Sequence, residues 1–186
     1  MQHVRFAVMA EGFLRETVVA WPALRSGEAQ SMLTTALLPT IDGKKPAPRS
    51  GFVPHLIYVV GGRDSSGRLS KVELYDPQNA SWTQLSPMTG PRLLHGCVAF
   101  DGKLYAVGGL GAAGQNLDTA EVYDPQTDGW QPLAKMTTRR SAFGLAAVGG
   151  KIYAIGGHGS GHWTSSLDSV EAYDPQLGSW ALVASM

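Results

Sequence analysis

The sequence is poor in cysteine and has no excess of either charge, and both features restrict what the protein can be. Its single cysteine, Cys97, cannot form a disulfide within the chain, which favours a reducing compartment, cytoplasmic or nuclear. With 15 basic and 15 acidic side chains, it lacks the cationic surplus that binds nucleic-acid phosphates or an anionic membrane. No apolar run reaches the roughly 20 residues of a membrane-spanning helix. We therefore expect neither nucleic acid nor a membrane as a partner.

Glycine and aromatic residues, by contrast, are present and periodic. The chain repeats itself about every 48 residues, and each period carries a glycine pair, a Tyr-Asp-Pro sequence, a tryptophan and a methionine in that order. A period of this length predicts a repeat architecture rather than a single irregular domain. The periodic residues are Gly61, Gly62, Tyr75, Trp82 and Met88, then Gly108, Gly109, Tyr123, Trp130 and Met136, then Gly156, Gly157, Tyr173, Trp180 and Met186.

Each period reads as four short β-strands separated by turn residues. In the second period, Asp101-Gly102 stands between two apolar runs, which is a strong signal for a two-residue hairpin. The repeats differ in length mainly between the glycine pair and the tyrosine, so we expect a loop there. Four antiparallel strands at this period predict a blade of a β-propeller. The expected strands are residues 94–100, 103–107, 120–123 and 130–133.

The periodic residues have structural reasons to recur. Glycine tolerates unusual backbone angles and a close approach of neighbouring backbone, and the aromatic rings are expected to pack between blades. The innermost strand should carry small residues, because blades crowd toward the axis. Arg92 and Arg140 also recur, so we expect them to be structural and to pair with the periodic glutamates. These glutamates are Glu73, Glu121 and Glu171.

Together, the glycine pair, the glutamate two residues before each tyrosine, the Tyr-to-Trp spacing and the periodic arginine resemble the kelch repeat. The resemblance covers about 130 of the 186 residues. It implies a mainly β fold, a partial kelch β-propeller of three four-stranded blades over residues 56–186. The first blade is expected to lack its innermost strand, because only Gly51 to His55 directly precedes its second strand. The expected repeats are about 56–90, 91–138 and 139–186.

The first 50 residues resemble a different domain. Residues 1–6, 11–14 and 22–26 are similar to the C-terminal end of the BACK domain, which precedes kelch repeats in the Kelch-like (BTB-BACK-Kelch) ubiquitin ligase adaptors. Ala29, Met32, Leu33, Ala36 and Leu37 have the spacing of an amphipathic helix. We therefore expect residues 1–38 to be a helical remnant of BACK and residues 39–55, rich in Pro, Gly and charge, to be a linker.

This resemblance implies a protein–protein interaction module that recognises a protein or peptide substrate for a cullin-type ubiquitin ligase, with the ligase-binding part missing from this chain. The alternative is an actin-binding or cytoskeletal scaffold. Three blades would also leave open edges, which predicts self-association.

In the family, partner peptides are bound by the loops after the second strand and by the segments entering each innermost strand. Carried over, these are Arg63, Asp64, Leu93, Leu94, Leu110, Asn116, Ser141, Ala142, His158, His162 and Trp163. Trp163 lies outside the repeat pattern, so it is either a binding anchor or folded back onto its own blade.

Three other patterns could suggest a nucleotide-binding, metal-binding or nucleophilic site, and each has a simpler interpretation. Residues 109–114 match G-x-G-x-x-G, but no helix pattern follows to hold a phosphate. His158 and His162 have the spacing of paired metal ligands, yet a glycine-rich loop does not hold them on one face. Cys97 lies among apolar residues of a predicted strand, which favours packing over nucleophilic attack. We expect no catalytic residues, no metal and no cofactor.

Overall fold

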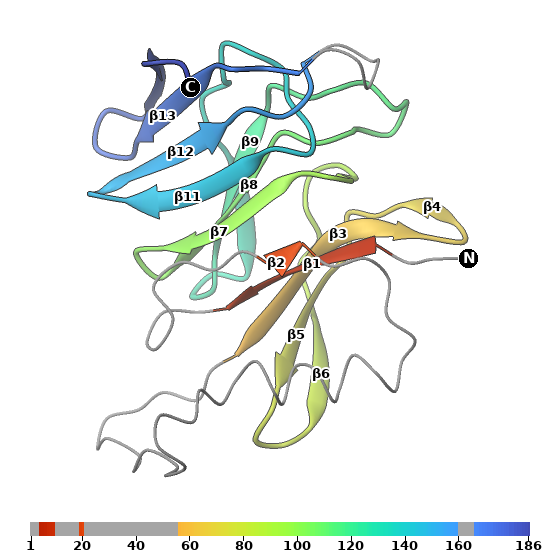
Figure 1. Ribbon diagram of the computed structural model, residues 1–186. Coiled ribbons are helices and arrows are strands. Elements are labelled where there is room, and N and C mark those ends of the chain that lie inside the picture. The colour runs from red at the N-terminus through yellow and green to blue at the C-terminus, as the bar shows by residue number, and fades with distance from the viewer. Residues whose placement is uncertain (1–3, 10–18, 21–55, 160–165) are drawn as a thin grey trace, which may run out of the picture.

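The computed structural model describes residues 4–9, 19–20, 56–159 and 166–186 (Figure 1). Within these ranges the chain forms fourteen strands, β1 to β14, in three antiparallel sheets, and it contains no helix. In this part of the chain there is accordingly no helix long and apolar enough to cross a membrane. Each sheet is one blade, so the predicted partial kelch propeller is confirmed as the fold class.

The second and third blades are four-stranded meanders that follow the predicted strands closely. The turn of the second blade is Asp101-Gly102, with φ values of 50° and 69°, and Phe100 pairs with Lys103 across it. Positive φ at both central residues is what the predicted hairpin turn requires. The strands are β7 (Gly96–Phe100), β8 (Lys103–Val107), β9 (Ala120–Asp124) and β10 (Gly129–Pro132), then β11 (Gly144–Val148), β12 (Lys151–Ile155), β13 (Val170–Asp174) and β14 (Ser179–Val183).

The first blade corrects one expectation. Its innermost place is filled by β1, which pairs antiparallel with β3, as in the pair Phe6↔Val60. The prediction that this blade lacks its innermost strand was therefore wrong. The filling strand comes from the N-terminal region and satisfies the main-chain groups along the edge of β3. The strands of this sheet are β1 (Val4–Met9), β2 (Val19–Ala20), β3 (Ile57–Asp64), β4 (Gly67–Arg68), β5 (Val72–Asp76) and β6 (Ser81–Leu85).

Two further expectations concern the region before the repeats. Residues 4–9 and 19–20 are strands, although they fall in the segment expected to be a helical remnant. The amphipathic helix expected over residues 29–37 and the linker over residues 39–55 lie outside the described residues.

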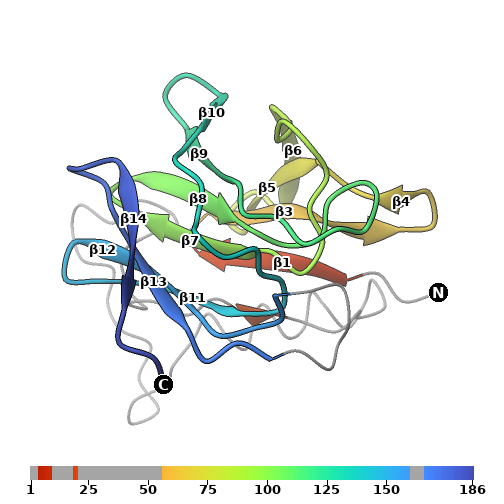
Figure 2. The same cartoon turned by 90° about the horizontal axis from the view of Figure 1, so that it is seen from above.

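The innermost strands β1, β7 and β11 lie side by side along the stack (Figure 2). Close contact explains the small residues predicted there. A Cβ atom on Gly96 in β7 would lie 2.8 Å from the Cβ atom of Leu145 in β11. Such a separation is too short for two side-chain carbons, so glycine is required where the strands meet.

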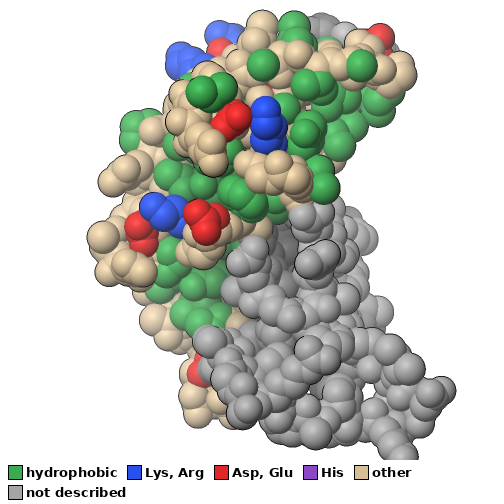
Figure 3. Space-filling model, turned by 90° about the vertical axis from the view of Figure 1, so that its left-hand side faces the viewer, with side chains coloured by type: hydrophobic (Ala, Val, Ile, Leu, Met, Phe, Trp, Pro, Cys, Tyr) green, Lys and Arg blue, Asp and Glu red, His purple; other side chains and the backbone are tan. Residues whose placement is uncertain are grey.

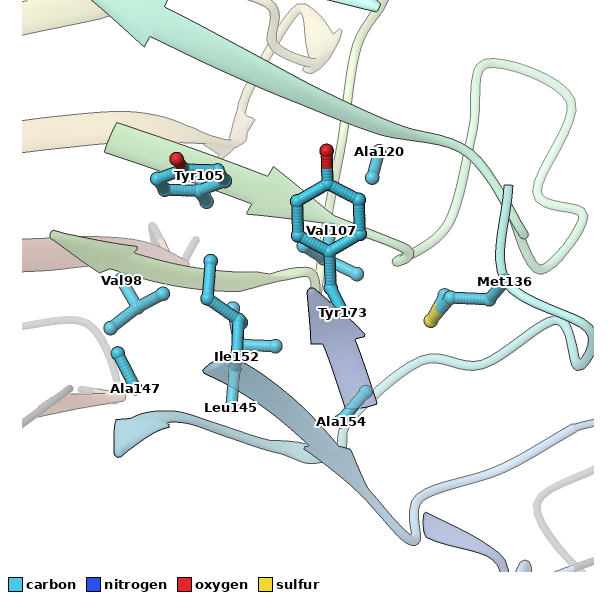
Figure 4. Packing of buried hydrophobic residues seen from close by; sticks show 10 residues of the cluster. All are labelled: Val98, Tyr105, Val107, Ala120, Met136, Leu145, Ala147, Ile152, Ala154 and Tyr173. Carbon is cyan, nitrogen blue, oxygen red and sulfur yellow. The ribbon is translucent and has the colours of Figure 1, made fainter. Parts of the chain in front are cut away.

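Hydrophobic clusters fill the spaces between blades. One joins the second and third blades and contains Tyr105, Ile152 and Tyr173 (Figure 4). The other joins the first and second blades and contains Tyr58, Cys97 and Tyr123. This packing confirms the expected position between blades for the periodic tyrosines Tyr123 and Tyr173, whereas Tyr75 lies on the face of the first blade that is turned away from the second.

The tryptophans of the second and third blades pack beside these tyrosines and also contact the preceding blade. The Tyr123 and Trp130 rings lie 5.2 Å apart, and Nε1 of Trp130 donates a hydrogen bond to the backbone oxygen of Ser86, at 3.0 Å. Trp180 makes the equivalent bond to the backbone oxygen of Ala134. Trp82, at the corresponding position of the first blade, is 52% exposed.

Candidate functional site

Two sets of segments meet at one end of the blades, on the right of Figure 1. One set follows the second strand of each blade, and the other leads into β7 and β11. We call this end the loop face and define it as residues 63–70, 91–95, 110–118, 139–143, 158–159 and 166–168. It contains the predicted partner-contacting residues that the structure describes.

Main-chain hydrogen bonds tie the two sets of segments together in the same way in both later blades. Leu93 and Leu110 exchange backbone hydrogen bonds of 3.1 and 2.6 Å, and Ser141 and His158 exchange bonds of 3.0 and 2.9 Å. Loops linked through their backbones lose less conformational freedom on binding than free loops do. The loop face is therefore preorganised.

Side chains also link one loop to the next. Nη1 of Arg68 donates to the backbone oxygen of Ala112 at 2.9 Å, joining the first loop to the second. Nδ2 of Asn116 donates to the backbone oxygen of His158 at 3.0 Å, joining the second loop to the third. Sequence reasoning missed Arg68, because it lies within the first repeat but is not one of the periodic residues. The sequence offers one weak indication of this contact, which is the glycine at position 114. Gly114 has a φ of 85°, and a Cβ atom there would lie 3.1 Å from Nη2 of Arg68.

Beneath the loops lie two buried ion pairs, which confirm the predicted pairing of the periodic arginines and glutamates. Arg92 contacts Glu121 and Arg140 contacts Glu171, each at 2.8 Å. Nη1 of each arginine also donates to the backbone oxygen of a paired glycine, Gly108 or Gly156, at 2.9 Å. The arginines thus fix the segments entering β7 and β11 against the ends of β8 and β12.

Hydrogen bonding keeps the buried carboxylate of Glu171 charged. Burial raises its pKa, but hydrogen bonds from Arg140 and from the backbone N–H groups of Thr137 and Thr138 outweigh this effect. The net result is a pKa for Glu171 below the ordinary value.

The predicted contact residues differ in how accessible they are. Asn116 and Ser141 are buried, at 7% and 3% exposure, and they hold the loops together rather than face solvent. His162 and Trp163 lie outside the described residues. Arg63 and Ala142 are exposed, and Asp64, Leu93, Leu94, Leu110 and His158 are half-buried.

Two of the accessible positions have unusual backbone geometry. Leu94 and Ala142 occupy equivalent places in successive repeats and have φ values of 54° and 50°. Left-handed conformations are uncommon for such residues, and when they persist they are often found at binding sites. The backbone N–H of Ala142 donates to the oxygen of Leu94 at 2.9 Å, so the two strained positions are adjacent.

His95 lies just below this surface, at the repeat position of Phe143. Its burial, followed by the nearby charge of Arg92, lowers the pKa of His95 to about 3. In the unfolded chain histidine binds a proton near pH 6.5, so stability is full above that pH and is lost as the pH falls from about 6.5 toward 3. At pH 5 the expected loss is about 2 kcal/mol.

Replacing His95 with phenylalanine should remove this loss. We expect His95→Phe to reduce the difference in the free energy of unfolding between pH 7 and pH 5 by about 2 kcal/mol, measured by urea denaturation. The carboxyl groups with lowered pKa values titrate at lower pH, so this interval reports mainly on the histidine. An unchanged difference in the variant would contradict the assignment.

The loop face carries accessible charged side chains of both signs. Arg63 is exposed, and Nε of Arg139, whose side chain is 63% exposed, lies 3.5 Å from a carboxylate oxygen of Asp118. Figure 3 views the opposite end of the blades, where basic and acidic side chains lie close to one another. Separately, Lys103 and Asp124 form an ion pair at 3.2 Å.

Cys97 and the possible metal ligands were the remaining candidates for reactive groups. Cys97 is fully buried, and burial raises the pKa of its thiol to about 12, so it is not an activated nucleophile. Among the residues that the structure describes, no three His, Cys, Asp or Glu side chains are grouped to hold a metal ion.

Comparisons with known proteins place these repeats in a family. The KLHDC2/KLHL20/DRC7 Kelch-repeats domain matches residues 30–186. A stretch of 55 residues is 49% identical to beta-scruin of Limulus polyphemus, covering 29% of this chain and 6% of that protein. Kelch-like protein 7 of Rattus norvegicus is 46% identical over 54 residues, covering 28% and 9%. The matched stretches thus span a small part of these relatives.

Two further comparisons agree with the match to the Kelch-repeats domain. Kelch-like ECH-associated protein 1A of Danio rerio is 44% identical over 61 residues, covering 29% of this chain and 10% of that protein. A solved structure titled "Structure of YjhT" superposes with a TM-score of 0.61 at 20% identity, covering 70% of this chain and 48% of that chain. At that identity, the likeness establishes the fold alone.

Proposed function

Because this chain belongs to the family of the KLHDC2/KLHL20/DRC7 Kelch-repeats domain, whose repeats are typically non-catalytic protein-interaction modules, we propose that its loop face binds a peptide segment of a partner protein. The observation that carries the proposal is the linkage between loops. Arg68 and Asn116 join three successive loops, while side chains outside the structural pattern remain accessible above them. A rigid frame with variable, accessible positions suits recognition of a particular partner.

The wider role we propose is substrate recognition for a cullin-type ubiquitin ligase in the cytoplasm or nucleus. The resemblance to the Kelch-like adaptors implies this role, and the similarity to Kelch-like protein 7 and Kelch-like ECH-associated protein 1A supports it. In such a protein the loop face would hold the substrate, and recruitment of the ligase would depend on other domains.

The test selects peptides from a random displayed library and compares variants of the chain. Leu94→Asp should weaken binding of the selected peptides at least tenfold, because it places a charge at a partly exposed apolar position of the loop face. Aspartate tolerates the left-handed backbone found at this position, so the fold should be retained. Affinity is measured by calorimetry.

The matched control is Leu177→Asp, at a leucine that is 76% exposed in the turn between β13 and β14, at the far end of the blade. This variant should bind like the unaltered chain. Equal losses in both variants, or no loss in either, would refute the loop face as the binding site.

An actin-binding scaffold is the second candidate, favoured by the local similarity to beta-scruin. Co-sedimentation with filamentous actin distinguishes it from peptide capture. If actin is the partner, the chain should pellet with filaments and Leu94→Asp should pellet equally. No co-sedimentation of the unaltered chain would remove this candidate.

A further inference from the structure

The hairpin formed by β3 and β4 carries two arginines opposite each other on the loop face, and it projects from the blades on the right of Figure 1. Arg63 in β3 is the direct cross-strand partner of Arg68 in β4. Side chains in such a pair share one face of the ribbon, with Cβ atoms roughly 5 Å apart, and like charges placed this way destabilise the hairpin. An anion bound between them would remove that repulsion.

Most other basic side chains already have a carboxylate partner. Among the lysine and arginine side chains that the structure describes, all but Arg63, Arg68 and Lys135 lie within 3.5 Å of a carboxylate oxygen. Two of these three cations without a carboxylate partner are therefore direct neighbours on the loop face.

The Arg68 side chain is already fixed in position. Its Nη1 donates to the backbone oxygen of Ala112 at 2.9 Å, while its Nε is shielded from solvent and has no acceptor. A carbonyl oxygen orients the guanidinium group without neutralising its charge. The contact also turns this side of the hairpin toward the loop of the second blade. A guanidinium group fixed in this way loses little conformational freedom when it binds an anion.

The acidic residue next to Arg63 has a different role. Asp64 pairs with Gly67, and successive side chains of a strand point to opposite faces, so Asp64 belongs to the other side of the hairpin. Its Oδ1 accepts hydrogen bonds from the backbone N–H and the hydroxyl of Ser66, at 2.8 and 2.6 Å. Asp64 therefore stabilises the turn rather than the arginine pair.

We propose that Arg63 and Arg68 together bind a phosphorylated side chain of the partner peptide, an inference that rests on the proposed binding of a peptide at the loop face. The two guanidinium groups bring two positive charges, and a phosphate ester carries about −1.5 to −2 at pH 7 with three acceptor oxygens. A single carboxylate would neutralise only one of the arginines. The forked donors of arginine also match the geometry of phosphate oxygens.

The experiment uses three matched peptide libraries with random flanks and phosphoserine, serine or glutamate fixed at the centre. Peptides retained by the immobilised chain are sequenced, resynthesised with each central residue and measured by calorimetry. The phosphoserine form should bind at least about tenfold more tightly than the serine and glutamate forms. Arg63→Gln should reduce this advantage to about threefold or less, because Arg63 is exposed and the substitution removes its charge without disturbing packing.

The matched control is Lys135→Gln, which removes an exposed cation that also lacks a carboxylate partner but lies outside the loop face. It should leave the phosphoserine advantage unchanged, and an equal loss would mean that overall charge, not the arginine pair, attracts the phosphate. Arg68→Gln should resemble Arg63→Gln. If it also breaks the link to Ala112 and disturbs the loops, Arg63→Gln alone decides the outcome.

The three libraries separate this inference from the function on which it rests. Glutamate peptides that bind as tightly as their phosphoserine forms would overturn the phosphate in favour of a carboxylate. Serine peptides that bind equally well would overturn anion recognition but leave peptide binding by the loop face intact. Failure of all three libraries to yield a bound peptide would contradict both.

Discussion

Arg140→Met is expected to lower the free energy of unfolding by about 3–5 kcal/mol, because it leaves a carboxylate buried without its partner. The Arg140 and Glu171 side chains are both fully buried, with 2.8 Å between Nη2 and Oε1. The same arginine also donates to the backbone oxygens of Gly156 and Ser169, which would lose their partner. Urea denaturation at pH 7 measures the loss.

The neighbouring residue supplies the control. Arg139 is 63% exposed and lies 3.5 Å from Asp118, so Arg139→Met should change stability by no more than about 0.5 kcal/mol. Adding Glu171→Leu to Arg140→Met should recover part of the loss, because the unpaired charge is removed. Equal losses for Arg139→Met and Arg140→Met would contradict the importance of burial.

Gly108→Ala is expected to cost about 2–4 kcal/mol, combining a left-handed backbone with overpacking. Gly108 has a φ of 60°, and an added Cβ would lie 2.6 Å from the backbone oxygen of Arg140 and 2.9 Å from the Phe143 ring. The oxygen belongs to the main chain and cannot move aside easily. The third blade should therefore shift away from the second.

Gly149→Ala separates the two contributions. Gly149 has a φ of 57°, nearly that of Gly108, but a Cβ there would meet nothing within 4 Å. Its cost should be about 1–2 kcal/mol, from backbone conformation alone. Thermal and urea denaturation of the two variants give the comparison, and similar costs would show that crowding at Gly108 is unimportant.

The candidate site could be located from the sequence but not resolved into contact and support residues. The repeat period identified both sets of loops, because the glycine pairs and arginines that border them recur. It could not show that Asn116 and Ser141 are turned inward, since a residue's neighbours in adjacent loops are about 40 positions away in the chain. Arg68 was missed for the same reason: its role depends on the backbone of Ala112, in another repeat.

The first blade gives the clearest example of a feature that the sequence could not predict. Nothing local in residues 4–9 indicates which strand they will pair with. β1 and β3 are separated by nearly 50 residues, and the strand carries none of the periodic residues that identify the other innermost strands. Any unpaired edge of a sheet favours a partner strand, and the sequence does not say where that strand lies.

By itself, the sequence determined the blade architecture, the hairpin turns and the identity of the buried ion pairs, because each depends on residues whose spacing repeats and whose chemistry permits few alternatives. Only the tertiary structure decided which strand completes the first blade and which loop residues remain accessible. These depend on contacts between segments far apart in the chain, where periodicity carries no information.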